Sequence, residues 1–191
     1  MKEPRTRKGE KTKRRILEAS IELIKERGFD NVTLSDMCQA ADVAPGTFYH
    51  YFSSNTDILW EILRVEGEEL LAYYHGLKGP ARERLGRLLD YQMNYYERKG
   101  KEVVAQIYQR EMAVGKGGSQ IEELLPLRDL TAQIIREGLA EAGKEGNPDE
   151  EAISLVSLIL FYSILWIRDS SGASLKDLMK DHINTALDTV F

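Results

Sequence analysis

Hydrogen-bonding side chains cluster around the proline–glycine pair of the segment APGTFYH. Thr47 offers a hydroxyl and a methyl group, and Tyr49 and His50 can donate hydrogen bonds to phosphate oxygens. Pro45 suits the first position of a helix, where a missing N–H costs nothing, and Gly46 lets an external partner approach the backbone closely. This composition is a poor one for a buried helix. It favours a short helix whose first turn contacts another molecule.

Two short helices joined by a tight turn are predicted to position these side chains. Thr33 and Asp36 match a capping box, so a first helix begins there and runs to about Ala40. Residues 41–43 form the turn, and the second helix starts at Pro45 and is about two turns long. Such a pair matches the helix-turn-helix pattern, whose second helix presents its N-terminal end to the major groove of DNA.

The rest of the chain is predicted to be helical as well, which makes the fold class all-α. Apolar residues recur with helical spacing, proline is scarce, and no long alternation of β-branched residues occurs. Capping residues and glycines set the boundaries. The nine expected helices cover approximately residues 12–27, 33–40, 45–52, 56–75, 81–98, 101–114, 120–143, 148–167 and 175–190.

Charge is distributed unevenly along the chain. The first fifteen residues carry eight basic and two acidic side chains, a net charge of +6, which leaves −11 on the other 176 residues of a chain whose formal net charge is −5. A basic N-terminal arm, residues 1–11, is consistent with a polyanionic partner at one end of the molecule, with Arg5 and Arg7 in a DNA minor groove. The alternative interpretation of this arm is a solvated, disordered tail.

Several function classes are disfavoured by the same composition. His50, His75 and His182 are widely separated and Cys38 is the only cysteine, so we find no catalytic triad, no metal site and no cofactor motif. The most apolar stretch, residues 153–167, is shorter than the roughly 20 residues that span a bilayer. We therefore expect a cytoplasmic protein, associated with the nucleoid, that is neither an enzyme nor a membrane protein.

Residues 12–63 resemble the DNA-binding domain of the TetR family of bacterial transcriptional regulators. Two segments carry the resemblance, ILEASIELIKERGFDNVTL and VAPGTFYHYFSSNTDIL. The resemblance covers about a quarter of the chain and implies three domains: the arm 1–11, a helix-turn-helix domain 12–57 with its motif at 33–52, and a ligand-binding and dimerisation domain 58–191. The implied function is a ligand-responsive repressor that binds a palindromic operator as a homodimer and is released by a small effector.

The resemblance also implies roles for individual residues of the motif. The DNA backbone would be contacted by Thr33, Thr47, Tyr49 and His50, and base edges by Ala44, Pro45, Gly46 and Thr47.

Three positions depart from the family pattern. Asp42 stands where the family usually has glycine in the turn, and Ala44 stands where a serine often caps the second helix, which removes a capping bond typically worth about 1 kcal/mol. Asn55, a candidate DNA-binding residue, stands where a lysine commonly meets phosphate, so one counterion-releasing contact is lost and the salt dependence of DNA binding is expected to be slightly flatter.

The two C-terminal helices carry long apolar stripes that predict a two-fold dimer. In a monomer one of these stripes would remain exposed, although the alternative is that both are packed internally. The predicted interface residues are Ile159, Trp166, Leu175, Met179, Ile183 and Leu187.

Aromatic residues in the middle of the chain are candidates for an effector cavity, which family analogy places among the helices between residues 56 and 167. An apolar pocket with scattered hydroxyls would suit a small aromatic or lipophilic molecule. The alternative is that these tyrosines are ordinary core and rim residues. The candidate ligand-binding residues are Tyr73, Tyr91, Tyr95, Tyr108, Phe161 and Tyr162.

The sequence has a second overall interpretation. The chain would then be a helical small-molecule-binding or adaptor protein that does not use DNA, which the absence of a phosphate-binding lysine at Asn55 would favour.

Overall fold

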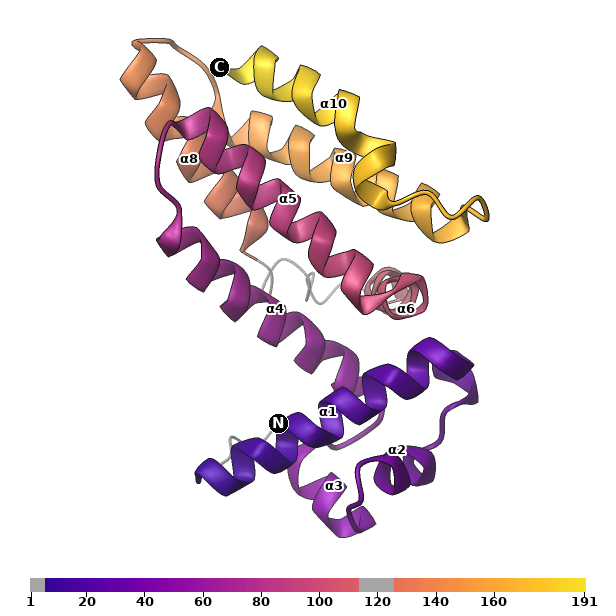
Figure 1. The fold of residues 1–191 in the computed structure, drawn as a ribbon. Helices are drawn as coiled ribbons and strands as arrows, with labels where there is room; N and C mark the ends of the chain where they lie inside the picture. Colours follow the sequence, from indigo (N-terminus) through magenta and orange to yellow (C-terminus); the bar gives the residue numbers. More distant parts are fainter. Residues whose placement is uncertain (1–5, 114–125) are drawn as a thin grey trace. The chain divides into compact units, whose positions relative to one another are not determined.

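The computed structural model describes residues 6–113 and 126–191, and in these ranges the chain is all-helical (Figure 1). Nine α-helices occur in the described ranges, as predicted, together with one short 3-10 helix and no strand. Their bounds are α1 Arg7–Arg27, η1 Phe29–Asn31, α2 Leu34–Ala40, α3 Pro45–Tyr51, α4 Thr56–Gly76, α5 Ala81–Lys99, α6 Lys101–Ala113, α8 Leu127–Ala142, α9 Pro148–Arg168 and α10 Leu175–Val190.

The first helix is longer than its apolar pattern predicted. Thr6 accepts a hydrogen bond from the Gly9 amide and caps α1, so the helix begins at Arg7 and not at Thr12. The expectation of a separate arm over residues 1–11 is therefore wrong from residue 7 onward. Polar and basic residues show no apolar periodicity, but Lys and Arg are good helix formers, which allows α1 to extend into the basic segment.

Local capping explains where the other helices begin. The predicted capping box of α2 is present, because Thr33 accepts from the Asp36 amide while Asp36 accepts from the Thr33 amide. Asn147 and Ser174 cap α9 and α10 through their side chains. Each of these caps satisfies an N–H that has no intrahelical partner.

The chain forms two compact units. Unit 1 comprises Met1–Val65 and Lys99–Gln120, and unit 2 comprises Glu66–Arg98 and Ile121–Phe191. Compared with the predicted boundaries, the N-terminal unit extends eight residues beyond position 57 and also includes α6.

The core of unit 1 fixes the position of α3. Five core side chains have no exposed surface: Ile16 and Ile24 of α1, Met37 of α2, Phe48 in the middle of α3 and Phe52 immediately after it. The α3 helix has only seven residues, too few for intrinsic stability, so this apolar packing holds it in place.

Unit 2 is built around α8 and α9, which pack against each other, and α10 packs on α9. The helix α9 is 21 residues long and, by length and composition alone, apolar enough to cross a membrane. The helix is longer than the apolar stretch 153–167 because it begins at Pro148, five residues before that stretch. A helix buried in a soluble core has the same composition, however, and α9 contacts two helices of its own unit.

Candidate nucleic-acid interface

The side chains of α3 divide between a buried and an exposed face. Phe48 and Tyr51 face the core, as does Phe52 immediately after the helix, whereas Tyr49 is 58% exposed and His50 is also exposed. The segment before and within the first turn, Ala44–Gly46, is exposed, and Thr47 is half-buried. The predicted contact residues of α3 therefore lie on one accessible surface, opposite the phenylalanines.

Gly46 has no internal reason to be glycine. Its φ does not lie in the left-handed region, and a Cβ atom added there would meet no heavy atom within 4 Å. The absence of a side chain therefore keeps open the surface at the first turn of α3. This observation is what a close approach of an external molecule to the backbone requires.

The turn before α3 is held by backbone bonds and by one side chain of α1. Asp42 adopts a left-handed conformation with φ 49°, which an aspartate tolerates where the family more often has glycine. The Val43 amide donates to the Cys38 carbonyl at 3.0 Å, and Arg15 of α1 donates to the Asp42 carbonyl at 3.3 Å. Ala44 caps α3 without a side-chain bond, as predicted.

Thr33 is exposed, but its hydroxyl is engaged in the capping box of α2. The hydroxyl accepts from the Asp36 amide and donates to the Asp36 carboxylate at 2.5 Å. The hydrogen bonds from Thr33 and the neighbouring Arg27 hold the pKa of Asp36 below its ordinary value. A phosphate contact by the Thr33 hydroxyl would therefore have to replace its bond to Asp36.

A buried ion-pair cluster connects the first and fourth helices within unit 1. The Lys13 ammonium lies 2.7 Å from the Glu61 carboxylate, whose side chain is 2% exposed, and Arg64 binds the same carboxylate at 2.6 Å. Burial raises the pKa of Glu61, but the hydrogen bonds and charges of Arg64 and Lys13 outweigh this, so the net shift is downward. Lys13 also lies 5.8 Å from the ring centroid of Phe52.

This cluster was not apparent from the sequence. Lys13 counts toward the basic N-terminal segment, yet the structure uses it inside unit 1 rather than on the surface. Arg14 is exposed and pairs with Glu18 at 2.8 Å. The exposed cations of the first turns of α1 are Arg7, Lys8 and Lys11.

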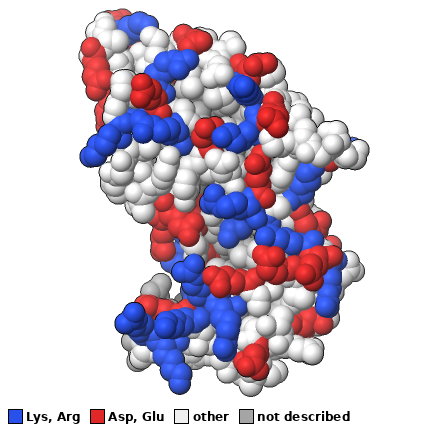
Figure 2. All heavy atoms as spheres, viewed as in Figure 1, with Lys and Arg blue, Asp and Glu red and all other residues white. Residues whose placement is uncertain are grey.

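Basic side chains gather around the N-terminal end of α1, as Figure 2 shows. Arg5, predicted to bind a minor groove, lies outside the described residues, whereas Arg7 is the exposed first residue of α1. Asn55, immediately before α4, is partly exposed, and its carbonyl accepts from the Ile58 amide at 3.2 Å. Its side chain is therefore accessible to a neighbouring molecule.

The predicted ligand-binding residues do not form a single cluster. Tyr73 of α4 and Tyr91 of α5 stack in unit 2 with ring centroids 4.3 Å apart, and Tyr95 is buried one turn further along α5. Tyr108 belongs to the core of unit 1. Phe161 and Tyr162 form an edge-to-face pair on α9.

Phe161 is 56% exposed, and the Tyr162 hydroxyl lies 3.0 Å from the His182 ring nitrogen of α10. An exposed ring does not line an interior cavity of its own unit, so the structure gives no support to Phe161 as a pocket residue.

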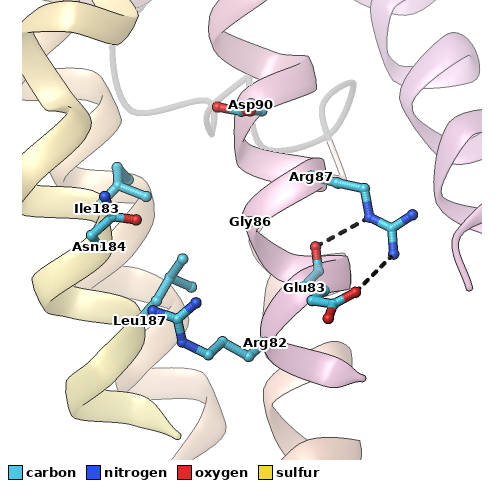
Figure 3. A pocket seen from close by; sticks show the side chains of 8 residues that line it. All are labelled: Arg82, Glu83, Gly86, Arg87, Asp90, Ile183, Asn184 and Leu187. Carbon is cyan, nitrogen blue, oxygen red and sulfur yellow. Dashed lines mark hydrogen bonds and ion pairs between the residues drawn. The ribbon is translucent and has the colours of Figure 1, made fainter. Parts of the chain in front are cut away.

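A surface pocket of about 390 Å³ lies between α5 and α10 in unit 2 (Figure 3). Its apolar side is formed by Ile183 and Leu187, and its charged groups are already paired: Arg87 donates to the Glu83 carbonyl and Arg82 binds Asp188. None of the predicted ligand-binding residues lines this pocket. Its lining residues are Arg82, Glu83, Gly86, Arg87, Asp90, Ile183, Asn184 and Leu187.

The predicted dimer interface requires correction. All six residues have at most 6% of their surface exposed within the chain, so a second copy cannot cover them. The periodic stripe of α10 is the face by which this helix packs on its own unit. The residues concerned are Ile159, Trp166, Leu175, Met179, Ile183 and Leu187.

A different apolar stripe of α9 is exposed. Five large apolar side chains on this helix have 40% to 56% of their surface accessible, and most of them recur at intervals of three and four residues. Large apolar side chains that are exposed together on one helix are typical of an interaction site. The exposed residues are Ile153, Leu160, Phe161, Ile164 and Leu165.

Within the described ranges, no group of three or more His, Cys, Asp or Glu side chains is arranged to hold a metal ion.

Comparison with known proteins supports the interpretation of the N-terminal unit. The family profile described as "Bacterial regulatory proteins, tetR family" matches residues 16–62. The HTH-type transcriptional regulator UidR of Escherichia coli K12 is 33% identical over 63 residues, which are 33% of this chain and 32% of UidR. The chain thus matches about a third of the length of this curated relative.

Solved structures resemble the chain over nearly its whole length. A regulator from Saccharomonospora viridis in complex with choline is 26% identical with a TM-score of 0.72, covering 94% of this chain and 96% of that one. FadR of Bacillus subtilis in complex with stearoyl-CoA is 20% identical with a TM-score of 0.72, covering 93% and 96%.

Proposed function

Because the chain belongs to the TetR family of bacterial regulatory proteins, we propose that it is a DNA-binding transcriptional regulator that acts in the cytoplasm at the nucleoid. In this proposal it is a repressor that binds a palindromic operator as a homodimer and is released by a small effector. The observation that carries the proposal is the exposed face of α3, with an open surface at Gly46 and donors at Tyr49 and His50.

The exposed face of α3 fits the major groove for steric and electrostatic reasons. The first turn has no bulky side chain, so the helix end can approach base edges through Ala44, Pro45, Gly46 and Thr47. The phenol of Tyr49 and the imidazole of His50 lie beside this turn and can donate to phosphates. Arg7 and its basic neighbours add a sequence-independent attraction to the DNA backbone.

Dimerisation is proposed to use the exposed stripe of α9 and not the buried one. Two copies related by a two-fold axis would bring the same apolar side chains together and cover them. Phe161 and Leu165 lie four residues apart on this stripe. The two copies of unit 1, which we call the reading units because they carry α3, would be related by the same axis and would require two half-sites of opposite orientation in the operator.

Release by an effector is proposed to act through the spacing of the two reading units. The fold neighbours with bound ligands, one with choline and one with stearoyl-CoA, support a ligand site in this architecture without identifying the ligand here. An effector that binds more tightly to a conformation with misplaced reading units shifts the protein away from DNA. The helix α4 contributes residues to both units and would transmit the change.

Selection of bound sequences from random duplex DNA tests the proposed function. The full-length protein is expected to enrich an inverted repeat whose half-site centres are about one or two helical turns apart. Binding to the enriched duplex is then measured by fluorescence anisotropy in the absence of any ligand. Retention of DNA without sequence enrichment, or no retention at low salt, would contradict the proposal.

A further inference from the structure

Unit 2 contains an aromatic cluster with a cation resting against it. The rings of Tyr73 and Tyr91 stack at 4.3 Å with an interplanar angle of 19°, and Tyr95 is 1% exposed. The guanidinium carbon of Arg98 lies 5.8 Å from the Tyr91 ring centroid and 5.5 Å from that of Tyr95. The faces of two aromatic rings therefore already bind a positive charge.

Carboxylates make the surroundings of these rings negative. Glu66 is 1% exposed and accepts a hydrogen bond from the Gln92 amide nitrogen. Burial raises the pKa of Tyr95, and the charges of Glu66 and Glu69 raise it further. Burial and the Glu69 charge likewise raise the pKa of Tyr91. Both phenols therefore lie close to negative charge, which the Arg98 guanidinium partly offsets.

Gln92 supplies an acceptor beside this carboxylate. The residue has no exposed surface, and its side-chain oxygen Oε1 is buried with no hydrogen-bond partner among the described residues. The same amide binds Glu66 through its nitrogen, which keeps Oε1 close to the negative cluster. A buried acceptor of this kind is satisfied by a donor group, which a small organic cation supplies either as the N–H of a protonated amine or as a hydroxyl beside a quaternary ammonium, as in choline.

We propose that the aromatic–acidic cluster, formed by Tyr73, Tyr91, Tyr95, Glu66 and Gln92, is the effector site and takes a small organic cation. The positively charged group of the effector replaces the Arg98 guanidinium on the rings of Tyr91 and Tyr95. Two aromatic faces and a buried carboxylate are the features that recognise quaternary ammonium and protonated amine groups. An anionic effector would instead be repelled by Glu66. The assignment of an effector rests on the proposed regulatory function, whereas the binding of a cation does not.

The position of Arg98 explains how a ligand can reach the rings and what its binding would change in the protein. Arg98 is exposed, so its guanidinium lies at the solvent side of the cluster and its departure opens the ring faces to a ligand. It is also the last residue of unit 2 before the chain enters unit 1 at Lys99, and Gly100 follows with φ 87°. Displacing Arg98 therefore changes the last turn of α5 at a point where the chain connects the two units.

Isothermal titration calorimetry on the full-length protein tests the proposal with three probes. Choline carries the charge, 3,3-dimethylbutan-1-ol is its neutral isostere, and butyryl-CoA is an anionic probe. We expect choline to bind at least about tenfold more tightly than the neutral isostere, the size of a partly desolvated cation–π interaction. Equal affinity for the two, binding of butyryl-CoA alone, or no binding of choline at millimolar concentration would overturn the proposal.

Two variants with opposite expected effects locate the site. Tyr91→Leu removes one ring face and should weaken choline binding roughly tenfold, whereas Arg98→Ala removes the internal competitor and should strengthen it severalfold. Tyr74→Leu and Arg136→Ala change the same residue types elsewhere in unit 2 and should leave the affinity unchanged. A merely structural role for the cluster would not produce tighter binding in Arg98→Ala, so an unchanged or weaker affinity there counts against the proposal.

The failure of this inference is distinguishable from the failure of the proposed function. Duplex binding is measured first without ligand, and choline is then added to the protein–DNA complex. If the protein binds DNA and no cation, the effector site is wrong while the regulator stands. If it binds choline but no DNA sequence, the cation site stands and the regulatory function is wrong.

Discussion

At the scale of single residues, the buried pair of Lys13 and Glu61 shows that counting the basic residues of the N-terminal segment overestimates the positive charge on its surface. A lysine in a basic run is normally solvated, yet this one is covered by the reading unit and neutralises a buried carboxylate. Burying either charge alone is strongly unfavourable, so the two side chains depend on each other. Arg64, one turn further along α4, completes the site by binding the same carboxylate. The cluster therefore links α1 to the first half of α4.

Glu61→Gln is expected to lower the free energy of unfolding by about 3 kcal/mol at pH 7, because it leaves the Lys13 ammonium buried without a counter-charge. The folded pKa of Glu61 is lowered from 4.5, so the carboxylate stabilises the fold above that pH and ceases to do so as the pH falls through its lowered pKa. The difference between variant and wild type should therefore shrink below about pH 4.5. Urea unfolding followed by circular dichroism measures it.

Glu18→Gln is the matched control for this prediction. Glu18 forms an exposed pair with Arg14 in the same helix, so removing its charge should cost less than about 0.5 kcal/mol. If the two substitutions lowered the free energy of unfolding equally, burial of the Lys13–Glu61 pair would contribute nothing to stability.

At the scale of elements, α1 places basic residues on a helix instead of an unstructured arm. Arg7 is its first residue, and Lys8 and Lys11 follow within the next turn, all exposed. Because a helix fixes their positions relative to the rest of unit 1, these cations would contact the phosphates of bound DNA without the entropic cost of ordering a tail. The extension of α1 thus makes the basic segment a rigid part of unit 1 and not a flexible arm.

The triple variant of Arg7, Lys8 and Lys11 to glutamine should weaken duplex binding and flatten its salt dependence. Removing one phosphate-binding cation reduces the slope of log K against log salt by about 0.9. Glutamine is a good helix former, so α1 should remain intact. The control changes Lys78, Arg136 and Lys180 of unit 2 to glutamine, which alters net charge equally. Equal slopes for the two triple variants would exclude a DNA contact by the first turns of α1.

The helix boundaries around α3 were predictable because residues close together in the sequence determine them. The capping box of Thr33 and Asp36 sets the start of α2, and Pro45 at the first position sets the start of α3. Asp42 adopts a left-handed backbone conformation in the turn, which an aspartate tolerates better than most residues. The Lys13–Glu61 pair was not predictable in this way. It joins residues 48 positions apart, and only the packing of α1 on α4 brings them together.

At the scale of the whole molecule, the apolar stripes of the C-terminal helices have different roles. Periodicity identified a stripe on α10, but it does not indicate whether the stripe faces the same chain or a second copy. The structure buries Leu187 and its neighbours on that stripe and leaves Phe161 and Leu165 of α9 exposed. We therefore expect the homodimer to form through α9.

The double variant Phe161→Glu with Leu165→Glu should yield a folded monomer that binds the inverted repeat far more weakly than wild type. Four charges would otherwise be buried in the two-fold interface. Leu187→Glu should behave differently and lower the melting temperature, since Leu187 is 2% exposed within its own chain. Sedimentation velocity and thermal melting distinguish the two outcomes. A double variant that still sediments as a dimer would place the interface elsewhere.

The central claim is that the open first turn of α3 enters the major groove, and Gly46→Glu tests it most directly. A Cβ atom at this position meets no heavy atom of the protein within 4 Å and the surface beyond it is exposed, so the fold and melting temperature should not change. Fluorescence anisotropy with the selected duplex should show at least about a hundredfold weaker affinity, because a carboxylate would meet base edges and phosphates. Gly76→Glu, at an equally open glycine, should bind as wild type does. Undiminished binding by a folded Gly46→Glu variant would contradict the account.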